Sequence, residues 1–235
     1  MPAPRSRRLL LIGAAVVVVL AIAGAVAWFV FLKGDADPAL KITDSKTGSG
    51  KAVSTSTLDG TWKVVAGTGD DATVAGYRVK EEFAAGARKV TANGRTNGVT
   101  GDLTVAGGKV TAAKLTVDMT TLASDEGRRD QTIKQRGLET NQFPTGTFEL
   151  TSPIALPVIT DGKVFTVKGA GKLTLHGVTK AVSIDLNAKV TGDTVTVQGA
   201  APIVMADYAI EPPSIGGFVS VSDSGSLEFL VSLQR

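Results

Sequence analysis

The sequence contains no cysteine and a single histidine, His176, among its 235 residues. Without thiols the chain forms neither a disulfide nor a thiolate metal site, so its folded part must be held together by packing alone. One histidine and no cluster of carboxylates at ligand spacing leave little from which to build a metal centre, and we expect none. There is no P-loop, no GxSxG elbow and no GxGxxG motif after an expected strand. These absences favour a binding protein without a covalent cofactor.

Catalysis of the Ser-His-Asp type would have to be built on His176, the one imidazole of the chain. His176 lies between Leu175 and Gly177, where a turn residue hydrogen-bonded to nearby backbone is its more ordinary role. We therefore expect no catalytic residue. An enzyme that acts through His176 is the third alternative, after a lipid-binding protein and a ligand-free interaction domain.

Charged residues are absent from Leu9 to Leu32, a run of 24 residues. As a helix this run reaches roughly 36 Å, against a hydrocarbon core of about 30 Å. Three arginines precede the run and no acidic residue occurs before Asp35, so the positive-inside rule places the N-terminus in the cytoplasm. We expect a cytoplasmic tail over 1–8 and a single transmembrane helix over 9–32, with the remainder outside the cytoplasm.

A cleaved signal peptide is the competing interpretation of this N-terminal part. Ala25-Val26-Ala27 fits the small-x-small cleavage pattern after a basic region. Against cleavage, the apolar run continues beyond this point to Leu32 and exceeds the usual length of a signal peptide's apolar region. The uncleaved anchor is therefore the first choice.

The net charge of +3 belongs to the N-terminal part of the chain. Arg5, Arg7, Arg8 and Lys33 are its only charged residues up to position 33, which leaves 21 Lys and Arg against 22 Asp and Glu over 34–235, a net charge of about −1. A nearly neutral domain offers no basic surface for nucleic acid, and we expect no such partner. Residues 33–57 are rich in Gly, Ser, Thr and Lys without a hydrophobic period, which predicts a flexible linker before a folded domain over 58–235.

Within the domain, apolar and polar residues alternate with a period of two, which is typical of strands with one buried face. Short Gly-containing connections, among them His176-Gly177 and Gly192-Asp193, predict hairpins in which consecutive strands pair antiparallel. About eight or nine half-buried strands must close or stack to hide their apolar faces, so a barrel is the first choice and a sandwich the second. The expected strands cover 61–66, 73–83, 88–105, 109–122, 163–175, 178–190, 193–204 and 227–233, with a further strand entered after Phe143-Pro144.

One segment departs from this pattern. Residues 124–138 predict a short helix with Ser124 as a candidate N-cap, acidic residues in its first turn and basic residues near its end. Its apolar stripe consists of Ile133 and Leu138, so we expect it to cover a rim of the barrel. Arginine forks match phosphate and carboxylate oxygens, so its charged residues could grip a ligand head group; a solvated helix face with internal ion pairs stays the alternative. The candidate rim residues are Arg128, Arg129, Asp130 and His176.

The expected interior is lined by small aliphatic residues, because the chain has only eight Phe, two Trp and two Tyr. An eight-stranded barrel is either filled by side chains or holds one small ligand, and a small aliphatic lining leaves more room. The residues that we expect to line it are Tyr77, Val79, Leu103, Leu115, Val117, Met119, Phe143, Phe148, Phe165, Val167, Leu173, Leu175, Ile184 and Leu186.

Three separate motifs resemble those of the YceI family, in the same order and spacing, over about residues 60–235. They are Ser124-Asp125-x-x-Arg128-Arg129-Asp130, then Leu138-x-Thr140-x-x-Phe143-Pro144-x-x-Thr147-Phe148, then Gly171-x-Leu173-Thr174-Leu175-His176-Gly177-Val178-Thr179. The resemblance implies a lipocalin-like antiparallel barrel with a helical cover, whose apolar interior binds a polyisoprenoid or another long-chain amphiphile without turnover. Gln131 departs from the family's common histidine after the Arg-Asp pair, and the anchor and the Ala/Val/Gly-rich composition resemble a membrane-anchored actinobacterial branch.

The leading hypothesis is therefore an extracytoplasmic protein, tethered to the cell membrane, that holds an isoprenoid lipid or quinone. The alternative is a ligand-free extracytoplasmic interaction or stress-response domain without catalysis. The residues leave the oligomeric state open, a homodimer included.

Overall fold

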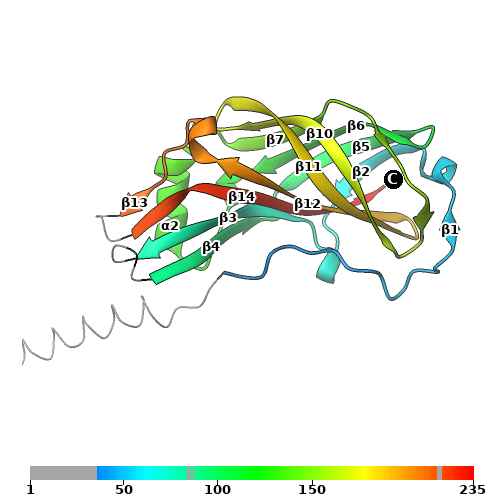
Figure 1. The fold of residues 1–235 in the computed structure, drawn as a ribbon, viewed down its shortest axis with the longest axis horizontal. Coiled ribbons are helices and arrows are strands. Elements are labelled where there is room, and N and C mark those ends of the chain that lie inside the picture. The colour runs from blue at the N-terminus through cyan, green and yellow to red at the C-terminus, as the bar shows by residue number, and fades with distance from the viewer. Residues whose placement is uncertain (1–35, 84–85, 87, 216–218) are drawn as a thin grey trace, which may run out of the picture.

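The computed structural model of the protein describes residues 36–83, 86, 88–215 and 219–235 (Figure 1). The predicted basic tail 1–8 and membrane helix 9–32 lie outside these residues. None of the helices within the described ranges is long and apolar enough to cross a membrane.

Long antiparallel strands make up most of the described chain. The strands are β1 (Ala52–Val53), β2 (Gly60–Val65), β3 (Val74–Phe83), β4 (Arg88–Thr96), β5 (Val99–Ala106), β6 (Lys109–Asp118), β7 (Thr145–Leu150), β8 (Ile154–Ala155), β9 (Ile159–Thr160), β10 (Val164–Leu175), β11 (Val178–Thr191), β12 (Thr194–Val204), β13 (Ser214–Ile215) and β14 (Val219–Gln234). The helical elements are η1 (Thr55–Leu58), η2 (Gly69–Asp71), η3 (Met119–Thr121), α2 (Gly127–Thr132), η4 (Ile133–Gly137) and η5 (Met205–Tyr208).

Eight of these strands close into a barrel. They pair in the order β12-β11-β10-β7-β6-β5-β2-β14, and β14 pairs back onto β12 through residues 195–204 and 224–233. On its other edge β14 pairs with β2 only at Ser232–Gln234. Along most of the remaining length of this edge β14 pairs with β3, which forms a hairpin with β4. The predicted all-β antiparallel barrel is thereby confirmed. Closure removes most of the exposed strand edges that an open sheet of this length would leave.

The hairpins explain how the long strands follow one another. The turn from β10 to β11 places His176 and Gly177 at φ of 47° and 74°, the pair of positive values that a two-residue type I′ turn requires. β4 and β5, in contrast, are consecutive but unpaired, because β5 pairs instead with β2 and β6. The expectation that consecutive strands pair was wrong between β2 and β3, which both pair with β14 instead. The single strand expected over 88–105 is divided at Asn97-Gly98, which carries the chain from one part of the wall to another.

The predicted helix is confirmed over Gly127–Gly137, as one α-helical turn and a half followed by a π-helical turn. Its N-cap is Glu126, whose carboxylate accepts the Arg128 amide, and the expected cap Ser124 was wrong. Ser124 instead donates its amide and its hydroxyl to the Asp130 carboxylate, because Asp130 turns back toward the start of the helix. The helix closes over one end of the barrel (Figure 1).

Two apolar clusters divide the barrel interior along its axis. We call the end beneath α2 and η5 the mouth; its cluster contains Met119, Leu175, Met205 and Ile210. The opposite end, the floor, is filled by Trp62, Ile159 and Leu233, each about 1% exposed. The Trp62 indole donates its N–H to the Leu58 carbonyl, so even this buried polar atom is satisfied.

Residues 36–53, which we call the strap, run along the outside of the barrel from the mouth to the floor (Figure 1). The polar composition of 33–57 predicts a flexible linker, but the described part of this segment has fixed partners. The Ala36 amide donates to Thr91 in β4, the Ser45 and Gly50 amides donate to Gly162 and Asp161, and β1 pairs with β9. Polar composition was a poor guide here, because the strap's backbone is hydrogen-bonded to the barrel.

Two carboxylates at the floor end make the strap's attachment sensitive to acid. Asp161 accepts the amides of Ser49 and Gly192, and Asp44 accepts the Val164 amide and the Lys163 ammonium. These hydrogen bonds hold the pKa of both carboxyls below the usual 3.8. A lowered pKa in the folded state means that the stabilisation is complete above pH 3.8 and is lost as the pH falls below it.

We therefore expect the amides of Ser45 and Gly50 to lose protection from hydrogen exchange as the pH is lowered from neutral to well below 3.8, after correction for the intrinsic rate, while the β10–β11 amides keep theirs. An Asp161→Asn variant should show weaker strap protection at neutral pH and a smaller change on acidification. Equal protection of the strap at both pH values would contradict this assignment.

Candidate functional site

A series of apolar cavities runs along the barrel axis from the floor to the mouth. The lower cavity has a volume of about 100 Å³, the middle one about 80 Å³ and the upper one about 60 Å³. Leu115, Phe148 and Phe229 border both the lower and the middle cavity. Tyr77, Met119, Leu175 and Leu227 border both the middle and the upper one. Neighbouring cavities are thus separated only by side chains, and the interior is a segmented channel.

Glycines on the inner wall keep this channel open. A Cβ at Gly199 would lie 2.8 Å from the Phe229 ring, and one at Gly171 would lie 2.4 Å from the Phe148 ring. A Cβ at Gly94 would similarly lie 2.4 Å from the ring of Tyr77. Each aromatic ring therefore lies against the backbone of a neighbouring strand, in space that any larger residue would occupy. With a larger residue at these positions, the rings would have to move from the wall toward the axis.

At the mouth, the upper cavity continues into a wider and more polar pocket. Ile133, Pro213 and Val221 border both, and the mouth pocket has a volume of about 560 Å³ and is partly open to solvent. Its polar lining comes from β3 and α2: Glu81, Glu126, Arg128, Arg129 and Thr132. The channel thus ends in a polar opening beneath the helix.

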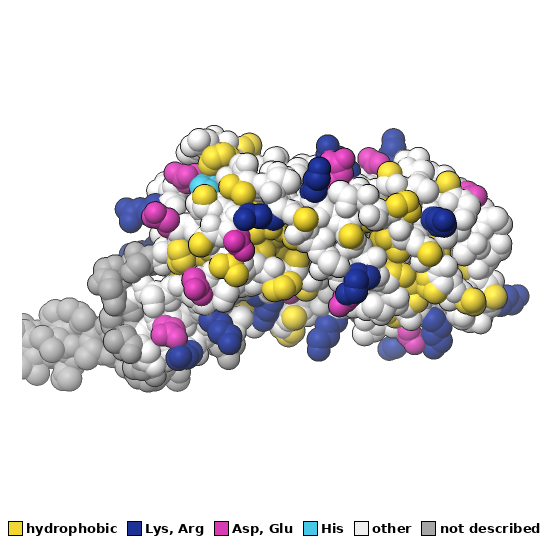
Figure 2. Space-filling model, turned by 45° about the horizontal axis from the view of Figure 1, so that its top comes forward, with side chains coloured by type: hydrophobic (Ala, Val, Ile, Leu, Met, Phe, Trp, Pro, Cys, Tyr) yellow, Lys and Arg dark blue, Asp and Glu magenta, His cyan; other side chains and the backbone are white. Residues whose placement is uncertain are grey.

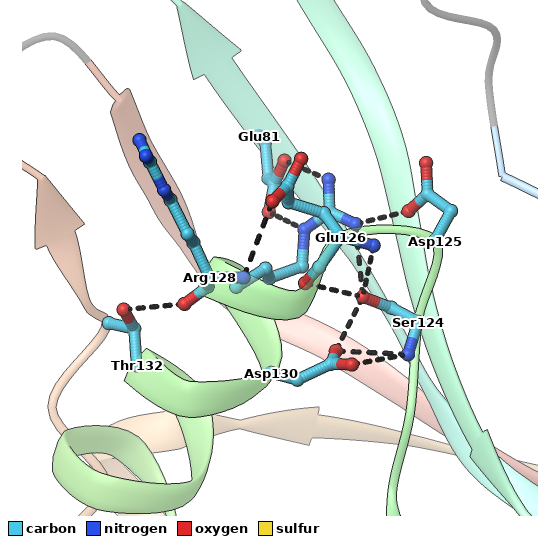
Figure 3. Close-up of polar contacts among 8 residues, drawn as sticks. Glu81, Ser124, Asp125, Glu126, Arg128, Asp130 and Thr132 are labelled. Carbon is cyan, nitrogen blue, oxygen red and sulfur yellow. Dashed lines mark hydrogen bonds and ion pairs between the residues drawn. The ribbon is translucent and has the colours of Figure 1, made fainter.

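Glu81 and Arg129 form a buried ion pair at this opening. Arg129 Nε donates to Glu81 Oε1 at 2.8 Å and Nη2 donates to Oε2 at 3.1 Å, so the contact is bidentate. The side chains are only 4% and 13% exposed. Arg129 Nη1 also donates to Asp125, at the surface (Figure 3). Burial alone would lower the pKa of Arg129, but the hydrogen bonds to Glu81 and Asp125 outweigh it and raise that pKa. The pair fixes α2 to β3.

Arg128 differs from its neighbour in the helix. Its backbone carbonyl accepts the Thr132 hydroxyl, while its side chain extends away from the Glu81 cluster (Figure 3). The side chain is exposed, and among the described residues no hydrogen bond or ion pair of its guanidinium is found. Arg128 is therefore the cation of the mouth pocket that is available to a ligand or to solvent.

Tyr77 brings a hydroxyl into the apolar channel. It borders the middle and upper cavities, it is 9% exposed, and no hydrogen bond of its hydroxyl is found among the described residues. Burial raises the pKa of this phenol, so the hydroxyl is protonated at neutral pH. It is a hydrogen-bond donor that a polar group of a bound ligand could satisfy.

His176 lies outside the channel, and its side chain contacts residues of two other segments, Glu139 with Phe143 and Tyr208. Its Nε2 is 2.8 Å from Glu139 Oε2, and its Nδ1 is 3.2 Å from the Tyr208 carbonyl oxygen. Phe143 packs against the imidazole, with 4.4 Å between the ring centroids. His176 and Glu139 both have positive φ, at 47° and 45°. This histidine is thus a structural residue of the mouth end, bonded to backbone that lies far away in the sequence.

The structure places thirteen of the fourteen predicted lining residues on the channel. Phe143 is the exception: it borders none of the four cavities described above, because it turns outward onto His176 and Gly177. Of the rim residues, Arg128 and Arg129 line the mouth pocket, whereas Asp130 is bonded to Ser124 and His176 to Glu139. Whether these residues bind a ligand stays a prediction.

Sequence reasoning missed Glu81, although a signal was present. Glu81 has the same alternation phase as Tyr77, Val79 and Phe83, so it points inward, where an unpaired carboxylate is rarely tolerated. Sequence reasoning also missed the glycines of the inner wall. They occupy the same alternate positions along their strands as the inward-facing aliphatic residues, as Gly199 does after Val195 and Val197. No group of three metal-ligating side chains comes together within the described ranges.

The fold is a closed antiparallel barrel with an apolar interior and a polar opening. Proteins of this class either enclose an elongated apolar ligand or fill the interior with their own side chains. Residues 49–233 match the model of the YceI-like domain, and the chain belongs to this family. The family resemblance expected from the three motifs is thereby confirmed.

Two solved structures are similar to this fold. A polyisoprenoid binding domain from Saccharophagus degradans is 16% identical, with a TM-score of 0.55 over 74% of this chain and 98% of that one. BcnA from Burkholderia cenocepacia is 17% identical, with a TM-score of 0.51 over 66% of this chain and 95% of that one. At such identity these likenesses establish the fold alone. Among curated proteins, no match to the sequence was found.

Proposed function

We propose that this protein is a membrane-tethered, extracytoplasmic binding protein that holds a long-chain amphiphile, a polyisoprenoid lipid or a quinone, in its barrel. The observation that carries the proposal is the line of apolar cavities from the floor to the polar mouth. Its shape suits a long, narrow, apolar chain with one polar end. The likeness to a polyisoprenoid binding domain supports the same class of ligand.

The free energy for binding would come from burying the ligand chain. Each buried CH₂ contributes about 0.8 kcal/mol, so a chain that fills the channel binds tightly with few polar contacts. The head group would then lie at the mouth, near Arg128, or place a polar atom against the Tyr77 hydroxyl. The described residues offer no nucleophile with an activating base along the channel, and the proposed role is binding without turnover.

The tethered and extracytoplasmic parts of the proposal rest on the sequence alone. The uncharged run Leu9–Leu32 is long enough to cross a bilayer, and the arginines before it favour a cytoplasmic N-terminus.

Gly199→Ala tests whether the open channel holds the ligand. The new Cβ would lie 2.8 Å from the Phe229 ring and 2.9 Å from Leu186, so the ring must move toward the axis, between the lower and middle cavities. We expect the lipid recovered per chain, measured by mass spectrometry of organic extracts of the purified protein, to fall severalfold. Gly127→Ala is the matched control, because nothing lies within 4 Å of a Cβ there.

A wild-type protein that is reproducibly empty, and that stays empty after incubation with vesicles containing polyprenyl lipid, would overturn the proposed function. In that case the fold would serve the alternative role, an interaction domain with a filled core.

A further inference from the structure

We propose that the mouth of the barrel faces the bilayer in which the chain is anchored, because the strap holds the end of the anchor beside the mouth. This inference rests on the proposed membrane anchor, and it adds an orientation and a membrane-facing surface. The partner is the lipid bilayer, from which a ligand would enter the channel directly.

The strap begins at the level of the mouth. The Ala36 amide donates to Thr91, which lies opposite Lys80 in the β3–β4 hairpin. Val79, the neighbour of Lys80, lines the upper cavity, and Glu81 lines the mouth pocket. The first described residue of the strap is therefore beside the opening of the channel, not at the floor.

A buried carboxylate on the outer wall fixes this first part of the strap. Glu228, with a side chain 3% exposed, accepts the Leu40 amide through Oε2 and Arg95 Nη2 through Oε1. Arg95 Nη2 also donates to the carbonyl of Pro38, and Arg78 Nη1 donates to that of Asp37. Releasing the strap would remove the Leu40 amide from Glu228 and the two backbone carbonyls from the arginines, while Glu228 would keep its ion pairs with Arg95 and Arg78. Such a cluster holds the strap against the β3–β4–β14 wall.

A second buried charge fixes the middle of the strap. The Lys189 ammonium, in a side chain 6% exposed, lies 2.9 Å from Asp71 Oδ1 and donates to the Thr43 carbonyl. Beyond it, the strap is bonded to Asp161 and Gly162 and ends in β1. The strap is thus attached along its length, so the free part of any tether ends at Ala36.

The chain between the anchor and the strap is too short to reach the floor. Leu32 ends the uncharged run, and four Cα steps to Ala36 span at most about 14 Å. β11 runs from the mouth to the floor with 14 residues, a length of about 46 Å, or roughly 35 Å along the axis at a usual barrel tilt. The floor end therefore cannot lie at the bilayer surface with the mouth pointing away from it while the strap stays attached, and a mouth-down orientation fits this short connection.

Charge does not determine this orientation. Over the face shown in Figure 2, basic and acidic side chains are interspersed without an extended patch of one sign. Residues 124–138 at the mouth carry three acidic and four basic side chains. The tether, and not attraction to anionic lipid, holds the mouth at the membrane, so the orientation should be the same on neutral phosphatidylcholine.

Single-cysteine labelling tests the orientation, because the chain has no cysteine of its own. Arg136→Cys places a fluorophore on the exposed surface of η4 at the mouth, and Asp193→Cys places one on the exposed β11–β12 turn at the floor. The full-length chain is reconstituted in phosphatidylcholine vesicles that carry a nitroxide on the lipid head group. We expect the mouth label to lose most of its fluorescence and the floor label to lose little.

A longer tether provides the second arm. About 20 Gly/Ser residues inserted between Asp35 and Ala36 add a coil of roughly 25 Å and should make the two labels nearly equally quenched. The same insert between Pro4 and Arg5, before the anchor, should change nothing. Equal quenching of the two labels without an insert, stronger quenching at the floor, or a chain that does not float with the vesicles would overturn the proposal.

Lipid content measured on the same samples separates this inference from the proposed function. An oriented but empty barrel refutes lipid binding and leaves the orientation intact. A lipid-loaded barrel with equally quenched labels refutes the orientation alone. A mouth label that is quenched only after another membrane protein is added would make that protein, and not the bilayer, the partner, and would also refute the inference.

Discussion

Replacing Arg129 by methionine is expected to lower the free energy of unfolding by about 3 kcal/mol or more. The substitution leaves Glu81 as a buried carboxylate without a counter-charge, and breaking a buried pair by removing one partner typically costs about 3–5 kcal/mol. Both hydrogen bonds between the guanidinium and Glu81 are lost, together with the link to Asp125 that fixes the start of α2. Chemical denaturation of the wild type and the variant would measure this difference in the free energy of unfolding. The slope of the free energy against denaturant concentration should be the same for both proteins.

Two matched variants separate the charge from the packing. Glu81→Gln combined with Arg129→Met removes both charges, so the double variant should recover most of the lost stability. Arg128→Met, one position away in the helix, removes an exposed arginine without an ion pair among the described residues and should change stability by less than about 0.5 kcal/mol. A double variant as unstable as Arg129→Met would show that the arginine acts through its packing and not through its charge.

Leu115→Trp is expected to reduce bound lipid at least about tenfold, the equivalent of about 1.4 kcal/mol of binding free energy. Leu115 lies on the inner face of β6, between the lower and middle cavities. An indole there would occupy the channel at the point that any long chain must pass. Because the space is already empty, the free energy of unfolding of the ligand-free protein should change by less than about 1 kcal/mol.

Lys114→Trp adds the same side chain to the same strand on its exposed outer face, and lipid binding should be unchanged. A filled core predicts the opposite pattern for Leu115→Trp, a loss of about 1–3 kcal/mol of stability from overpacking with no effect on lipid. Lipid content and denaturation curves of the same preparations therefore decide between a channel and a core.

The barrel was predictable from the sequence because its physical cause is local. Apolar and polar residues alternate along each strand, as at Ala113, Leu115 and Val117, and closure follows from hiding the apolar faces together with the strand edges. The short helix was predictable from the acidic residues at its start and from Lys134 and Arg136 near its end, which match the helix dipole. Its position over the rim was predictable from Ile133 and Leu138, which both contact the upper cavity.

The ion pair and the strap were not predictable, because their partners lie far apart in the chain. Glu81 and Arg129 are 48 positions apart, and the Leu40 amide meets Glu228 at a separation of 188. The strap's composition is that of a linker, and its hydrogen bonds are to barrel groups such as Asp161, whose position depends on the finished fold. The orientation of Phe143 was not predictable either. Its side chain points toward His176 because of the loop geometry around Glu139, which no pattern of hydrophobicity encodes.

The most direct test of the proposed function is an experimental structure of the protein after incubation with a polyprenyl lipid. The account predicts one continuous, elongated density that runs from the mouth pocket past Tyr77 and between Leu115, Phe148 and Phe229 toward the floor. An interior closed by these side chains, with no density along the axis, would contradict it.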